Sequence, residues 1–274
     1  TTLIASGQDI TLDEAASTFG TLALTGSNVA VTENAAMDLG ASTIGGTANF
    51  NSTSNVITDS GTLAITGATT INAGTADITL DQAASTFGAL ALTGANVAVT
   101  ENAATDLAAS TVSGTLGVTS TGAVTDSGTL AITGATTISA SGQDITLDEA
   151  ASTFGTLALT GANVAVTENA ATDLGASTVS GTFGITSGGA ITDSGTQTIT
   201  GAATFTNTAG TNDAITLDDV SNAFSGTVTF STDSGSAVTV VDTTALDLLA
   251  LTAASLSVTA GGAVTDSGTL AITG

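Results

Sequence analysis

The chain has 274 residues, 24 of them acidic, and it contains no Lys, Arg, His, Cys, Pro, Trp or Tyr, so its formal net charge is −24. Without basic residues it is not expected to bind nucleic acid or anionic lipid, and without Cys and His it has no disulfides, thiol chemistry or common zinc ligands. Because 42% of the residues are hydrophobic, we expect the acidic chain to fold; no apolar run is long enough for insertion into a membrane.

Taken in chain order, the predicted elements are short strands that recur as near copies. The segment ITLDEAASTFG at Ile10–Gly20 returns at Ile78–Gly88, at Ile145–Gly155 and, in degenerate form, from Ile215. Two further markers recur with it. They are VTEN from Val31, Val99 and Val166, replaced by VVDT at Val240, and TDSG from Thr58, Thr125, Thr192 and Thr265. The offsets of 68, 67 and 70 residues for the first marker define a tandem repeat of about 67 residues.

Each marker ends a β-like run with an acid, in the order LD, TE, TD. These landmark acids are Asp13, Glu33, Asp59, Asp81, Glu101, Asp126, Asp148, Glu168, Asp193, Asp218, Asp242 and Asp266. Their spacing runs from 20 to 26 residues and averages 23. We therefore interpret the 67-residue repeat as three turns of a shorter period.

A period near 23 predicts an all-β parallel β-helix (β-solenoid), right-handed by the usual rule for parallel crossovers, with about 12 rungs of about 23 residues and a three-rung super-repeat. Large and small residues alternate at the strand period of two, as in Leu63–Thr66. Equivalent Phe residues are expected in the core, at Phe19, Phe87, Phe154 and Phe224. The alternative fold is a string of β-sandwich modules of about 67 residues, which usually carry a core Trp or Tyr.

The expected domain organisation is one continuous solenoid over residues 1–274, with super-repeats at 1–61, 62–128, 129–195 and 196–268, and with 269–274 starting the next. The last super-repeat is the most divergent, and it is the only place that leaves room for a specialised loop, around Thr206–Asp213. The final TLAITG joins in register to the opening of the chain. We therefore expect the solenoid to continue end to end, either covalently or by head-to-tail stacking of chains.

The phrases TLAITGATTISASGQDITL (Thr129–Leu147) and DLGASTVSGTFGITSGGAITDSG (Asp173–Gly195) resemble the repeats of filamentous-haemagglutinin-like, β-strand-repeat bacterial surface exoproteins. The resemblance covers essentially the whole chain. It implies an exported, extracellular or cell-surface protein that forms β-helical rods and serves adhesion, with surface or glycan ligands as partners.

The landmark acids allow two interpretations. Asp and Glu are typical of solvated turns. If they shared one corner, however, carboxylates stacked at about 4.8 Å would form a ladder able to bind Ca²⁺. A second set of acids precedes Leu once per repeat, at Asp38, Asp106, Asp173 and Asp247.

We expect no enzymatic function and no required cofactor, because every prominent acid recurs whereas a catalytic pair of carboxylates is normally unique. A structural or adhesive component of a filament or coat is the predicted function. The alternatives are a β-helical polysaccharide-active enzyme or phage tail-spike-like rod, and an ice-binding solenoid. The last is disfavoured because Thr-x-Thr does not recur once per rung.

Overall fold

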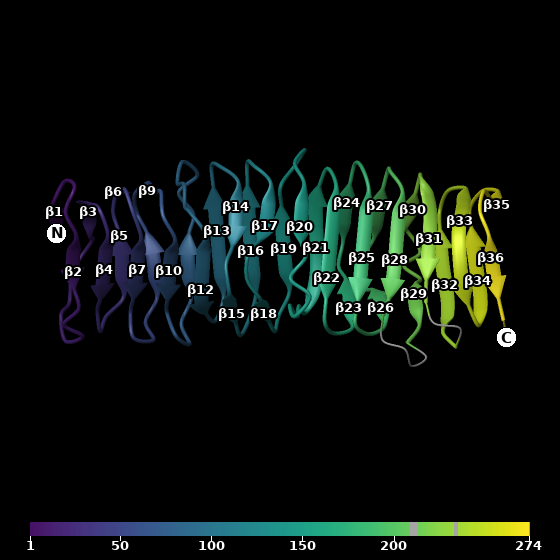
Figure 1. Cartoon of the computed structure of the whole chain (residues 1–274), viewed down its shortest axis with the longest axis horizontal. Coiled ribbons are helices and arrows are strands. Elements are labelled where there is room, and N and C mark those ends of the chain that lie inside the picture. The colour runs from purple at the N-terminus through teal and green to yellow at the C-terminus, as the bar shows by residue number, and fades with distance from the viewer. Residues whose placement is uncertain (209–212, 233–234, 274) are drawn as a thin grey trace. The chain divides into compact units, whose positions relative to one another are not determined.

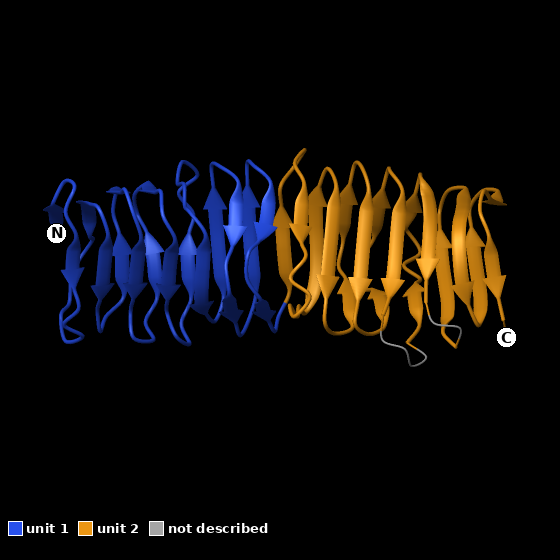
Figure 2. Ribbon diagram, viewed as in Figure 1, with its two compact units in different colours: residues 1–134 blue, residues 135–274 orange. Residues whose placement is uncertain are grey.

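A computed structural model describes residues 1–208, 213–232 and 235–273. These residues form short β-strands in two compact units, Thr1–Gly134 and Ala135–Gly274 (Figures 1 and 2). The strand pairs of the described residues are parallel in both units; in the first, for example, Thr69 faces Leu90 in such a pair. Among the described residues, no helix has the length and apolar character needed to cross a membrane.

The strands of the first unit are three to five residues long. In chain order they are β1 (Thr2–Ile4), β2 (Ile10–Leu12), β3 (Ala23–Gly26), β4 (Val29–Thr32), β5 (Met37–Leu39), β6 (Ser42–Ile44), β7 (Ala48–Asn51), β8 (Ile57–Asp59), β9 (Leu63–Ile65), β10 (Thr69–Asn72), β11 (Ile78–Leu80), β12 (Leu90–Gly94), β13 (Val97–Glu101), β14 (Thr105–Leu107), β15 (Ser110–Val112), β16 (Leu116–Ser120), β17 (Val124–Asp126) and β18 (Leu130–Ile132).

The second unit has strands of two to eight residues. They are β19 (Thr136–Ser139), β20 (Ile145–Leu147), β21 (Thr156–Gly161), β22 (Val164–Glu168), β23 (Thr172–Leu174), β24 (Ser177–Val179), β25 (Phe183–Ser187), β26 (Ile191–Asp193), β27 (Gln197–Ile199), β28 (Ala203–Asn207), β29 (Ile215–Leu217), β30 (Ala223–Phe224), β31 (Thr227–Ser231), β32 (Ala237–Asp242), β33 (Leu246–Ala253), β34 (Ser255–Ala260), β35 (Val264–Asp266) and β36 (Leu270–Ile272).

The first unit is built from parallel ladders in which each turn of chain adds one level. One ladder runs β2, β4, β7, β10, β12, so that Ile10, Val29, Ala48, Thr69 and Leu90 lie one above another. A second ladder runs β5, β8, β11, β13, β16. A third ladder runs β1, β3, β6, β9. It lies on the same face as the second ladder, because β3 pairs with β6 through Thr25 while Leu22, just before β3, forms a bridge to β5.

The repeat does not contain a whole number of turns. β2 and β11 carry the same ITL sequence, yet β2 belongs to the first ladder and β11 to the second. Between them the chain returns to the first ladder three times, at β4, β7 and β10, and then crosses once more. One repeat is therefore about three and a half turns, and successive repeats present the same sequence on alternate faces.

The second unit follows the same rule. β20, β22, β25 and β28 succeed one another in one ladder. β29, the sequence equivalent of β20, instead pairs with β26 and β32 in the other ladder. The alternation of faces is thus a property of the repeat and not of one unit.

The parallel β-solenoid and the repeat of about 67 residues are confirmed, with about 13 turns in the chain. The predicted rung of about 23 residues is too long, because ladder partners such as Ile10 and Val29 lie 19 residues apart. The predicted three-rung super-repeat is likewise replaced by three and a half turns. Of the segment Thr206–Asp213, where the sequence leaves room for a specialised loop, residues 209–212 lie outside the described part of the chain. The handedness and the proposed super-repeat boundaries stay predictions.

The interior is filled by the inward side of each strand. In β9, Leu63 and Ile65 are buried while Ala64 is exposed, which is the alternation expected of strands. The Phe residues predicted to be core residues are buried at Phe87, Phe154 and Phe224, whereas Phe19 is only half-buried. In the second unit Phe205 packs against three rings, with centroid distances of 5.8 Å to Phe183, 6.0 Å to Phe224 and 5.7 Å to Phe230.

Glycines are required at one corner, where the backbone of one turn lies directly on the next. A Cβ on Gly67 would lie 2.5 Å from the carbonyl oxygen of Gly46, and one on Gly88 would lie 2.3 Å from that of Gly67. The Gly67 N–H donates to the Gly46 carbonyl oxygen at 2.9 Å. No side chain fits between backbones this close, so glycine recurs at this corner.

Candidate functional site

The landmark acids are the predicted site residues, and the structure separates them into three groups. The LD acids lie just beyond the ends of their strands and are exposed; they are Asp13, Asp81, Asp148 and Asp218. The TE acids lie in the interior, and the TD acids are mostly half-buried or buried beneath the loop of the next turn. The environment of each acid therefore follows its marker type.

The TE acids Glu33, Glu101 and Glu168 are 0%, 0% and 2% exposed, and Asp242, their equivalent in the fourth copy, is 2% exposed. Each accepts a hydrogen bond from the backbone N–H of the Phe in the preceding ITLD-type segment. The donor–acceptor distances are 2.6 Å from Phe19 to Glu33, 2.8 Å from Phe87 to Glu101, 2.8 Å from Phe154 to Glu168 and 3.3 Å from Phe224 to Asp242. The buried acid thus fixes the loop that carries the core Phe.

The second carboxyl oxygen of these acids has few hydrogen-bond donors near it. Glu168 Oε2 accepts a hydrogen bond from the Thr172 hydroxyl at 2.9 Å. Glu33 Oε2, Glu101 Oε2 and Asp242 Oδ2 are buried and have no hydrogen-bond partner among the described residues. Burial raises the pKa of Glu33 and Glu101, and it raises the pKa of Glu168 to about 7.

The TD acids accept hydrogen bonds from the loop one turn further on. Asp59, 7% exposed, accepts from the backbone N–H of Asp81 at 2.8 Å and of Gln82 at 3.4 Å. Asp193 accepts from the backbone N–H of Asp218 at 2.8 Å and from the Asn222 side-chain amide at 2.5 Å. Burial raises the pKa of both carboxyls, against the lowering effect of these donors.

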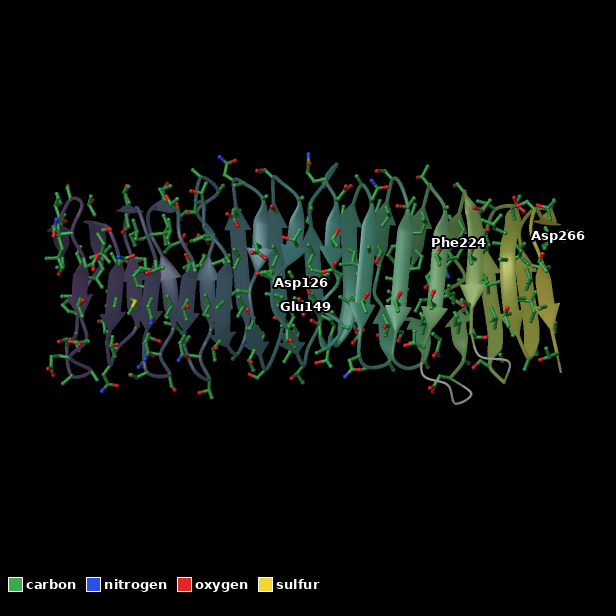
Figure 3. All side chains as sticks on the ribbon, viewed as in Figure 1. Asp126, Glu149, Phe224 and Asp266 are labelled. Carbon is green, nitrogen blue, oxygen red and sulfur yellow. The ribbon has the colours of Figure 1, made fainter. Side chains whose placement is uncertain are left out.

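The remaining TD acids differ in exposure. Asp126 is buried, at 8% exposed, whereas Asp266 lies exposed in the last described turn (Figure 3). Asp266 faces Leu248 in the ladder, as Asp193 faces Leu174 and Asp126 faces Leu107. A TD acid therefore faces a leucine in the ladder on the side of the preceding turn, and Asp59 and Asp193 contact the backbone of an LD acid on the side of the next turn.

The landmark acids do not all share one corner: Asp59 and Asp193 lie next to the LD acids of the following turn, whereas the TE acids lie in the interior. Glu101 and Glu168 face Ser120 and Ser187 in the ladders, so neither is stacked on another acid there. Among the described residues no group of three or more acidic side chains is placed to hold a metal ion. The stacked geometry assumed for the Ca²⁺ ladder is therefore corrected, because three and a half turns per repeat put the markers at different places on the turn. Ca²⁺ binding by these acids stays a prediction.

The chain matches the family described as "Repeats of unknown function (DUF5649)" over residues 26–93, 94–160, 161–231 and 235–274. The chain belongs to this family. No curated protein and no solved structure matches it. The first three matched segments begin at Gly26, Gly94 and Gly161, which end β3, β12 and β21 in successive repeats. The DUF5649 repeat thus coincides with the 67-residue unit defined by the markers.

A polar set that the sequence analysis missed occurs three times, and each copy reaches across the start of a matched DUF5649 segment. In one of them, Asn96 donates from its backbone N–H and its side-chain amide to Asp77 Oδ1, both at 3.0 Å. Its own Oδ1 accepts from the backbone N–H and the hydroxyl of Thr115, both at 3.1 Å. The three residues lie 19 residues apart and thus join three turns.

The copies of this Asp–Asn–Thr set use the same atoms. They are Asp9, Asn28 and Thr47 in the first unit, and Asp144, Asn163 and Thr182 in the second. The signal was present in the sequence, because each Asn immediately precedes a VAV segment and each Asp an ITL segment. The 19-residue separation would also have given the correct turn length.

The second set of acids also accepts hydrogen bonds from neighbouring turns. Asp38 Oδ2 accepts from the hydroxyls of Thr21 at 2.5 Å and Ser60 at 2.9 Å. Asp173 Oδ2 accepts from those of Thr156 and Ser194, both at 2.8 Å. In a chain without basic side chains, carboxylates thus accept hydrogen bonds from backbone N–H groups and hydroxyls of adjacent turns, and these contacts join the turns.

Proposed function

We propose that this DUF5649 chain is a non-catalytic structural element of an extracellular filament or cell-surface coat, with adhesion as its companion role. The observation that carries the proposal is the recurrence of the Asp–Asn–Thr set. Asp77, Asn96 and Thr115, and their two copies, use their hydrogen bonds to join one turn to the next. A chain selected for turn-to-turn cohesion along its length suits a load-bearing role.

A non-catalytic role is supported by the use made of the acids. The buried acids accept hydrogen bonds from loop backbones. Glu168 accepts from the Phe154 N–H, and Asp59 and Asp193 accept from N–H groups in the loop of the next turn. Each arrangement recurs from repeat to repeat, whereas a catalytic carboxylate pair is normally one unrepeated pair. Acids held by structural hydrogen bonds are poor candidates for the polysaccharide-active or tail-spike-like alternative.

The extracellular location rests on resemblance. The repeats resemble those of filamentous-haemagglutinin-like surface exoproteins, and such proteins are exported and adhesive. We extend that location to this chain, with surface or glycan ligands as the adhesive partners.

We further propose that turns of this solenoid stack end to end, within a longer chain or between copies. In the last described turn, Val264 and Ile272 are 51% and 49% exposed. Val264 is the repeat equivalent of Ile57, and the residue that covers Ile57 is Ile78. Ile10 is the equivalent of Ile78, so a turn of the β2 type fits this edge in register. The unpaired N–H and C=O groups of such an edge can also form hydrogen bonds with a further strand.

The experiment is electron microscopy of the purified chain, combined with antibody labelling of intact and permeabilised source cells. We expect filaments with the width of one solenoid and labelling of intact cells. Labelling confined to permeabilised cells would contradict the surface location, and discrete 25.9 kDa particles at all concentrations would contradict end-to-end stacking. A polysaccharide-cleaving activity abolished by a single acid substitution would contradict the non-catalytic role.

Ice binding is the second candidate, and one observation favours it. In the second unit Thr167, Thr186, Thr206, Ser231 and Thr252 are ladder partners and form a column of hydroxyls, one per turn. A second, parallel column is broken, since Ala165 and Gly184 precede Thr204 in it. A thermal hysteresis assay decides: a freezing-point depression that is lost in T186V/T206V supports this candidate, and no depression eliminates it.

A further inference from the structure

Three glutamates lie in the interior of a chain that has no basic side chain. Glu33, Glu101 and Glu168 each follow a VAVT segment, and all three are at most 2% exposed. An ionised carboxylate in such a place has lost its water and has no cationic side chain to compensate. The protonation state of these carboxyl groups therefore affects the stability of both units.

The donors around the three carboxyls are few and unequal. Glu168 receives the Phe154 N–H and the Thr172 hydroxyl. Among the described residues Glu33 receives only the Phe19 N–H, because Met37 stands where Glu168 has Thr172. Met37 is itself 1% exposed, so the side of Glu33 that it covers is apolar. One N–H bond does not replace the hydration of a full negative charge.

The charged side chains on the elements packed against these glutamates are all acids, and the N-terminal ammonium of Thr1 donates to the Thr21 carbonyl oxygen at 2.6 Å, beyond the loop that carries Phe19. The loop that donates the Phe19 N–H begins with Asp13 and Glu14, and the loop that donates the Phe154 N–H begins with Asp148 and Glu149. In the loop of Phe87, Asp81 is followed by neutral Gln82. On the other side the ladder neighbours Ser120 and Ser187 are neutral. Any effect of nearby charge therefore also favours the protonated form.

We propose that Glu33, Glu101 and Glu168 are protonated, neutral acids in the folded chain, and that the solenoid is therefore an acid-stabilised structure whose Phe-bearing loops loosen as the pH rises. This inference does not depend on the proposed function.

The direction of the pKa shift determines whether stability rises or falls with pH. Burial raises the pKa of each group above its unfolded value, so the folded state keeps a proton that the unfolded state has already lost. The stabilisation is complete below the unfolded pKa and is lost as the pH rises through the folded one. For Glu168 this window runs from 4.5 to about 7. Across it the folding equilibrium constant falls by roughly two orders of magnitude for this one group.

The test is urea unfolding of the whole chain, followed by far-ultraviolet circular dichroism, between about pH 5.5 and pH 8.5. Exposed carboxyls with ordinary pKa values are already ionised throughout this range. We expect the midpoint of the wild-type chain to fall with pH, and the curve to be flatter in E101Q/E168Q, where glutamine keeps the shape without the ionisation. The control D266N changes an exposed aspartate outside the Phe-bearing loops and should keep the wild-type slope. Equal slopes in E101Q/E168Q and D266N would overturn the proposal.

A second measurement covers variants that fail to fold. Infrared difference spectroscopy of the wild-type chain at about pH 6 reports protonated carboxyl groups directly through their C=O stretch. We expect a band that disappears on titration to about pH 8.5, in the same range as the loss of stability. The absence of that band at about pH 6 in the folded protein would refute the protonated state whatever the variants do.

Discussion

The ring cluster around Phe205 offers the sharpest test of how the interior is stabilised. Phe205 is fully buried, and its ring stacks on Phe230 at 5.7 Å with an interplanar angle of 19° and meets Phe183 and Phe224 edge-on at 80° and 84°. Replacing Phe205 by Leu keeps most of the apolar volume and removes all three ring contacts. Phe50 is also fully buried but has no ring partner among the described residues, so Phe50→Leu is a matched control.

Aromatic pairs contribute about 0.5–1.5 kcal/mol each beyond their buried area. Three pairs therefore give Phe205→Leu an extra loss of about 1.5–4.5 kcal/mol, while Phe50→Leu should cost less than about 1.5 kcal/mol. Because solenoids unfold locally, amide hydrogen exchange resolved over β25, β28 and β31 is the appropriate assay, with β4, β7 and β10 followed for the control. Equal losses of amide exchange protection in the two variants would refute the idea that ring contacts, and not side-chain volume, stabilise the interior around Phe205.

Further predictions concern the corner glycines, the polar set, the buried acid and cations. Gly67→Ala should cost about 1–3 kcal/mol in thermal unfolding because its Cβ would lie 2.5 Å from the Gly46 oxygen, whereas Gly117→Ala, whose nearest neighbour is 3.8 Å away, should be tolerated. Asn96→Ala should cost about 1 kcal/mol or more, since it removes bonds to two turns; an unchanged melting temperature would contradict this. Thr172→Val removes a donor that lowers the pKa of Glu168, so a carbon NMR titration should find that pKa above about 7. If the landmark acids bind Ca²⁺, melting curves with Ca²⁺ and with EDTA should differ, and identical curves would eliminate a structural ion.

The turn length is the feature on which the sequence pattern misleads. Because LD, TE and TD follow similar strands, the pattern predicts one landmark acid per turn. They occupy different environments, since Asp81 is exposed, Glu101 is fully buried and Asp59 lies under the next loop. The separation between Asp77 and Asn96, repeated in two other copies, was the better measure of a turn. Side chains that hydrogen-bond across adjacent turns must be one turn apart, whereas similar strand ends need not be.

The sequence by itself determined the tandem repeat, the β-solenoid class and the alternation that places Leu63 and Ile65 inside and Ala64 outside, because these depend on local patterns with periods of 2 and about 67 residues. It also placed Phe87, Phe154 and Phe224 in the core. Only the tertiary structure decided that a repeat is three and a half turns and that β2 and β11 lie in different ladders. The same is true of the burial of Glu33, Glu101 and Glu168. The physical reason is that stacking depends on which residues meet one turn later, and strands of nearly identical sequence do not specify their partner until the whole turn has closed.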